Sequence, residues 1–190
     1  MRKLLVTRES PCIQPIRELI EKQNHRTLVA WAIDCAEHVL PIFEGRHPVD
    51  SRPRDALKAA ETWACGDIKM PIAKKAAHAA HNAATEVEDD PAACAAARAM
   101  GHVVGTVHVE THAIGLIIYG ITAVIYASKE INSDDVIARE CKFFYERLKY
   151  WEENIDVEER RWAPFLLRDD VPNKEKQLRE KAEQKKKKAL

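Results

Sequence analysis

Two histidines in the segment TVHVETHAIG have the spacing that metal chemistry on a helix needs. His108 and His112 are four residues apart, so on a helix they share a face, as two metal ligands would. The zinc-protease pattern HExxH requires Glu directly after the first His. Val109 holds that position, so we do not expect that chemistry. Alternatively, His102, His108 and His112 are core polar groups, hydrogen-bonded to carboxylates or backbone on neighbouring helices.

The segment WAIDCAEHVL carries a second set of reactive side chains. Asp34 and His38 are four residues apart and can pair on one helix face, either to orient His38 as an acid–base group or as an internal hydrogen bond. Cys35 lies three residues before His38, which permits a thiol-nucleophile interpretation. Reactive thiols favour accessible helix ends, whereas Cys35 lies in mid-helix on an apolar stripe. We therefore expect Cys35 to pack in the core.

Two arginines flank Pro53 in the segment DSRPRDA, beside a predicted helix start. The guanidinium groups of Arg52 and Arg54 suit carboxylates and phosphates. They can equally form a rigid loop that ties neighbouring helix ends. A further pair, His78 and His81 on an alanine-rich helix, is typical of partly exposed surface groups.

These side chains require helices to position them. The alanine-rich, glycine-poor composition favours helix over strand. Residues 98–127 are the most apolar run and should form the buried centre. One straight helix from Pro91 to Ser128 would be about 57 Å long, so we expect a break between Gly105 and Thr111. Apolar periodicity and cap residues predict further helices at about 13–23, 25–44, 53–65, 71–87 and 134–154, and a short final element at 160–168.

The domain should span residues 1–172 as a single all-α, irregular bundle of about six or seven helices around a buried apolar helix or kinked helix pair. Residues 173–190 are rich in Lys and lack an apolar face, which predicts a charged, frayed or disordered tail. Asn24 is the expected N-cap of one helix, and Asp89 or Asp90 is the expected N-cap of another.

Composition limits the class of partner and the compartment. The formal net charge is zero, so no general attraction to nucleic acid is expected. Five cysteines without a CxxC motif argue against a disulfide framework and, with an N-terminus that has no long apolar stretch, favour a cytoplasmic protein. The uncharged run 113–127 has fifteen residues, short of the roughly 20 that span a membrane, so no membrane partner is expected.

Three segments together resemble a known family: WAIDCAEHVLPIFE, DSRPRDALKAAETWACGDI and ARAMGHVVGTVHVETHAIG. The phrases DCAEH, DxRPR and GHxxxTxHVxTHA are the most specific. They are similar in order and spacing, over about residues 24–127, to the bacterial putative immunity proteins of polymorphic toxin systems, grouped as an immunity-five-like domain.

The resemblance implies a cytosolic all-α protein that binds and neutralises a cognate toxin, without catalysis and without a cofactor. It leaves a homo-oligomer open. The alternative is a helical metal-binding protein or enzyme in which the polar residues of the family phrases meet in one buried cluster, which would be a structural network or a site. The members of this candidate cluster are Asp34, His38, Arg52, Arg54, His102, His108 and His112. His108 and His112 would be its metal ligands.

Overall fold

The computed structural model describes residues 4–128 and 133–188, with side chains to residue 185. These residues form eight α-helices and no β-strand, which confirms the all-α prediction. The α-helices are α1 (Gln14–Ile20), α2 (His25–Glu44), α3 (Arg52–Ala64), α4 (Met70–Glu86), α5 (Pro91–His108), α6 (Ala113–Ala127), α7 (Ser133–Asn154) and α8 (Lys174–Lys188). Four 3-10 turns accompany them: η1 (Pro11–Ile13), η2 (Glu110–His112), η3 (Ile155–Val157) and η4 (Pro164–Leu167).

Two helix starts follow directly from their cap residues. The side chain of Asn24 accepts a hydrogen bond of 2.8 Å from the backbone N–H of Thr27, at the start of α2. The side chain of Asp90 accepts one of 3.2 Å from the N–H of Ala93, and Pro91 occupies the first position of α5. Both caps satisfy amide groups that have no partner within the helix. The sequence predicts the first of these caps, and of its two candidates for the second, Asp89 and Asp90, the structure selects Asp90.

The apolar run is an antiparallel hairpin, α5 and α6, joined by the short turn η2. Val109 breaks the helix because its backbone is extended, with φ −157° and ψ 138°. The predicted break between Gly105 and Thr111 is thus confirmed. The ring of His102 lies against Gly115, and the ring of His112 lies against Gly105, so the two helices run in opposite directions.

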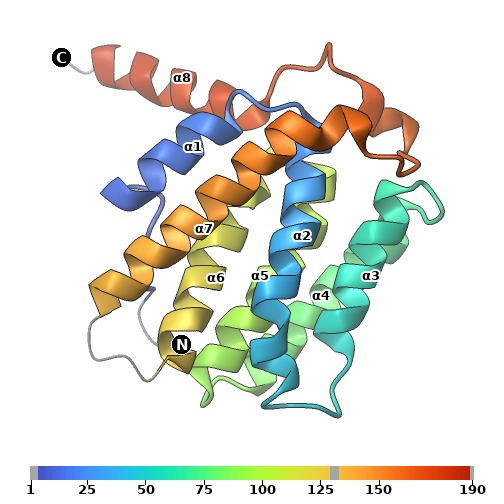
Figure 1. The fold of residues 1–190 in the computed structure, drawn as a ribbon, viewed down its shortest axis with the longest axis vertical. Coiled ribbons are helices and arrows are strands. Elements are labelled where there is room, and N and C mark those ends of the chain that lie inside the picture. Colours follow the sequence, from blue (N-terminus) through green and yellow to red (C-terminus); the bar gives the residue numbers. More distant parts are fainter. Residues whose placement is uncertain (1–3, 129–132, 189–190) are drawn as a thin grey trace.

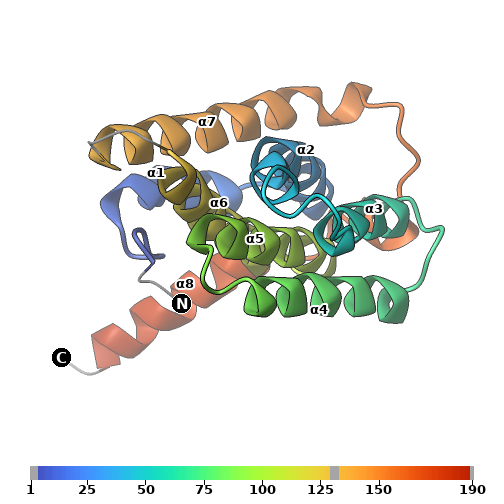
Figure 2. The same cartoon turned by 90° about the horizontal axis from the view of Figure 1, so that it is seen from below.

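The hairpin lies in the middle of the bundle. Helix α2 packs against both α5 and α6, while α7 covers α2 and α6 on one side and α4 covers α5 and α3 on the other. Figure 2 shows α7 and α4 on opposite faces with α2, α5 and α6 between them. The largest fully buried side chains include Trp31 of α2 and Phe144 of α7, whose rings contact each other edge to face. The indole N–H of Trp31 donates to the carbonyl of Phe144 across this interface.

One segment, Glu110–Ala127, has the length and hydropathy of a membrane span, with a mean hydropathy of 1.4. Half of it is buried inside the bundle. The core helix of a soluble protein has the same properties, so the segment is weak evidence for a membrane.

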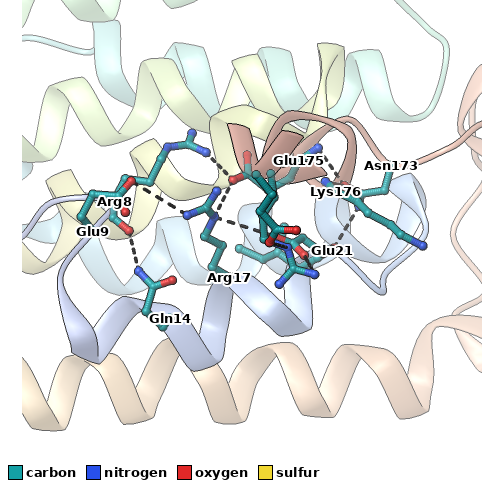
Figure 3. A network of polar contacts seen from close by, with 11 residues as sticks. Arg8, Glu9, Gln14, Arg17, Glu21, Asn173, Glu175 and Lys176 are labelled. Carbon is teal, nitrogen blue, oxygen red and sulfur yellow. Dashed lines mark hydrogen bonds and ion pairs between the residues drawn. The ribbon is translucent and has the colours of Figure 1, made fainter. Parts of the chain in front are cut away.

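The Lys-rich tail contains the eighth helix, α8, which the expected count of six or seven did not include. Its first turn docks on α1 through Glu175, whose side chain is completely buried. Figure 3 shows Arg8 and Arg17 pointing at this carboxylate, and the Arg17 Nε lies 3.0 Å from the Glu175 Oε1. In the next turn of α8, the Nη2 of Arg179 lies 3.0 Å from the Oε2 of Glu21, at the end of α1 (Figure 1). Towards its C-terminal end, α8 leads away from the other helices (Figure 2). Fraying of this outer part stays a prediction.

Candidate functional site

The seven polar residues of the candidate cluster do not meet in one place. The structure separates them into three groups, which lie between α2 and α7, at the start of α3, and along the α5–α6 hairpin. The fold therefore does not bring these side chains together in a single buried His/Asp/Arg cluster. Helical spacing places residues on one face but does not say which helix that face meets.

Asp34 and His38 each bind a partner on α7 rather than each other. The Asp34 Oδ2 accepts from the Nε of Arg147, at 2.7 Å, and from the indole N–H of Trp151, at 2.8 Å. The His38 Nε2 lies 2.7 Å from the Oε2 of Glu140, a buried acid. These contacts fasten α2 to α7. Cys35, between them in sequence, is fully buried, and burial raises the pKa of its thiol, as expected for a packing residue.

Arg52 and Arg54 form ion pairs at the start of α3. The guanidinium of Arg52 binds Asp50 and also Glu86, at the end of α4. The guanidinium of Arg54 binds Glu37 and Glu44 on α2. Every one of these carboxylates belongs to this chain, so the two arginines tie three helix ends together.

The third group is built on glycines. In three places a histidine ring lies where the Cβ of any other residue would be. His81 of α4 lies on Gly101, with its Cε1 2.4 Å from the Cβ position, and His112 lies on Gly105 at 2.6 Å. His102 lies on Gly115 of α6 at 2.2 Å. The glycines therefore let imidazole rings approach the helix backbones closely.

His102 and His112 form a hydrogen bond between their Nδ1 atoms, which are 3.2 Å apart. His102 also stacks on Tyr119, with ring centroids 5.2 Å apart. Burial, with smaller effects from His112, His81 and Arg98, lowers the pKa of His102 to about 3. Burial, and then the neighbouring His108, also lowers the pKa of His112. Both rings are therefore neutral at pH 7, and one Nδ1 can donate its proton to the other.

A pocket of about 290 Å³ opens beside this pair, between α3, α4 and α5. We call it the histidine pocket. Its floor is the glycine face of α5, and Trp63 of α3 forms a wall against which His108 stacks, with ring centroids 6.2 Å apart. Its mouth is exposed. The lining residues are Trp63, Met70, Lys74, Ala77, His78, His81, Gly101, Val104, Gly105, His108 and His112.

Nitrogen groups supply the polar character of the histidine pocket. In the part of the chain that the structure describes, four histidines and Lys74 line it, and no Asp or Glu does. Among the described residues, Lys74 has no ion-pair partner and the Nδ1 of His81 is buried without a hydrogen bond. Burial, with smaller effects from Arg98, His78 and His112, lowers the pKa of His81. The pocket thus offers hydrogen-bond donors and one fixed positive charge.

The predicted metal ligands, His108 and His112, both line the pocket, but the structure pairs His112 with His102. Among the described residues, no group of three or more His, Cys, Asp or Glu side chains is arranged to hold a metal ion.

Sequence reasoning missed the α4 side of the pocket. His81 had been interpreted as a surface group, and Lys74, Met70 and Trp63 had not been singled out. One feature of the sequence is related to the position of His81. Gly101 and Gly105 are four residues apart on α5, so they form a groove into which a facing helix can place large rings. Nothing in the sequence says that α4 is that helix.

Comparison with protein families matches residues 18–149, more than two thirds of the chain, to the family described as "Imm-5 like putative immunity protein". The chain belongs to this immunity-protein family. The matched residues begin in α1 and end in α7, so they contain the α5–α6 hairpin and the whole histidine pocket, and exclude α8. Comparisons with curated proteins and with solved structures gave no match.

Proposed function

We propose that this protein is a bacterial immunity protein that binds a cognate toxin of a polymorphic toxin system in the cytoplasm and neutralises it, without catalysis of its own. The observation that carries the proposal is the family match over residues 18–149. The match covers the folded core and not merely a short motif. Neutralisation by binding requires a preformed, rigid surface, because a disordered surface loses affinity on ordering.

The arrangement of the polar residues supports binding over chemistry. Asp34, His38, Arg52 and Arg54 are each engaged in contacts that fasten one helix to another. Two polar groups have no hydrogen-bond or ion-pair partner among the described residues and line a pocket whose mouth is exposed: the ammonium of Lys74 and the Nδ1 of His81. Unsatisfied polar groups in an accessible concave site are typical of a recognition surface.

The experiment is co-expression with the protein encoded by the neighbouring gene. The candidate toxin is induced in bacterial cells with and without this chain, and growth is measured. The two purified proteins are then mixed and examined by size-exclusion chromatography. We expect restored growth and a co-eluting complex. Restored growth without a complex would contradict neutralisation by binding. Stoichiometric Zn, Fe or Mn in the purified protein would favour the metal-binding alternative.

A further inference from the structure

Arg98 differs from the other arginines that the structure describes. It alone among them forms no ion pair with a carboxylate, and its Nε is buried without a hydrogen bond. Arg98 lies on α5 near His81 and His102 and helps to lower the pKa of both, after burial, the larger effect. Lys74 of α4, an exposed lysine that lines the pocket, has no ion pair with a described carboxylate either. Among the described residues, no carboxylate therefore neutralises these two cations.

The donors in the pocket suit a carboxylate in an apolar surrounding. The ammonium of Lys74 and the N–H groups of the imidazoles can each donate to a carboxylate oxygen. Met70, Val104 and Ala77 provide apolar contacts for the carbon chain that bears it, and Trp63 adds a ring wall. A volume of about 290 Å³ suits one acidic side chain, at the lower limit of small-ligand sites.

We propose that the histidine pocket binds a carboxylate, and that its source is an Asp or Glu side chain that the toxin inserts on docking. The carboxylate site stands on the geometry of the pocket alone. Its assignment to a toxin side chain rests on the proposed function. The exposed mouth residues Met70, His78 and His108 then form the rim around the inserted side chain.

The first experiment tests the site without the toxin. Glutarate, an acid with an apolar stem, is titrated into the full chain, and the imidazole Cε1–H signals of the histidines are followed by NMR at pH 6.5. Glutaramide, its neutral analogue, is the control ligand. We expect saturable shifts of the pocket histidines with glutarate and not with glutaramide. Equal shifts with both ligands, or none with glutarate, would overturn the carboxylate site.

Matched lysine variants locate the site. Lys74 and its neighbour Lys75 are both exposed, but only Lys74 lines the pocket. We expect Lys74→Gln to weaken glutarate binding by up to about fivefold, the upper range of an exposed ion pair. Lys75→Gln should leave it unchanged. The same loss in both variants would mean that glutarate responds to the general charge of α4 and would contradict the proposal.

The second experiment tests the source of the carboxylate in the complex. Lys74→Glu should weaken the toxin complex by about tenfold or more, because it opposes like charges, whereas Lys75→Glu should have a much smaller effect. If the complex forms and the two variants bind equally, the toxin does not use the pocket. If glutarate binds but no complex with any co-encoded toxin forms, the proposed function fails while the carboxylate site remains, with a free small acid as its ligand.

Discussion

His102 and His112 face each other across the α5–α6 hairpin with their Nδ1 atoms 3.2 Å apart. One Nδ1 must donate and the other accept, so the contact exists only while at least one ring is neutral. Burial under Gly115 and Tyr119 keeps His102 in that state. This pair closes the turn of the hairpin, and His112 also lines the histidine pocket. Protonation of the pair therefore affects both the stability of the hairpin and the pocket.

The protein should lose stability as the pH falls below 6.5. The pKa of His102 is about 3 in the folded protein, whereas its ordinary value of 6.5 applies to the unfolded chain. As the pH falls, the unfolded chain therefore binds the proton first. The contribution of His102 is fully present above pH 6.5 and is lost progressively towards pH 3. Between pH 7 and pH 5 the loss should be about 2 kcal/mol in the free energy of unfolding. Urea unfolding at the two pH values measures it.

His81 and His112 should add to this loss, because their pKa values are also lowered. A His102→Phe variant retains a ring against Tyr119 but does not titrate, and should therefore show a smaller loss between pH 7 and pH 5. His78→Gln, at an exposed position, is the control. If the pH dependence of stability is unchanged in His102→Phe, it does not come from His102.

Gly115→Ala should destabilise the protein despite the better helix propensity of Ala. The new methyl group would lie 2.2 Å from the His102 ring, which is held between His112 and Tyr119 and has no room to swing away. Overpacking costs about 1–3 kcal/mol, more than the gain in propensity of up to about 1 kcal/mol. In the double variant with His102→Ala the two changes should be less costly than the sum of the single changes. Thermal unfolding of the four proteins tests this, and strict additivity would exclude the contact.

Asp34→Ala should loosen α7 from α2. It removes the acceptor for Arg147 and Trp151, and leaves both donors without a partner at a half-buried interface. We expect a loss of about 1–3 kcal/mol in the free energy of unfolding. Glu146→Ala, which removes an exposed pair with Lys142 on the same helix, should cost about 0.5 kcal/mol or less. Similar costs for the two variants would mean that the Asp34 contacts are not stabilising.

Glu175→Ala should release α8. The change leaves Arg8 and Arg17 without the buried carboxylate that they share. A charged hydrogen bond contributes about 1.5–3 kcal/mol, so trypsin cleavage after Lys176 should be accelerated about tenfold or more. Glu180 is exposed on the same helix. Trypsin should therefore cleave the Glu180→Ala variant at the same rate as the wild-type chain. Equal rates in the two variants would show that Glu175 does not hold α8.

The helices were largely predictable because their signals are local. Asn24 and Asp90 cap helices, and the length limit on the apolar run led to the break at Val109. The docking of α8 was not predictable, because Glu175, its buried contact, is one glutamate in a charged sequence and its partners Arg8 and Arg17 lie more than 150 residues away. The candidate site was found only in part, since His108 and His112 line it but their α4 neighbours depend on which helices pack together.

The most direct test of binding through the histidine pocket is a measurement of affinity for the toxin encoded beside this gene. Calorimetry on the purified proteins compares the wild-type chain with the Lys74→Glu and Lys75→Glu variants. We expect a stable complex with the wild-type chain. Its affinity should fall by about tenfold or more in Lys74→Glu and much less in Lys75→Glu. The absence of any complex with a toxin from whose action this chain rescues cells would contradict neutralisation by binding.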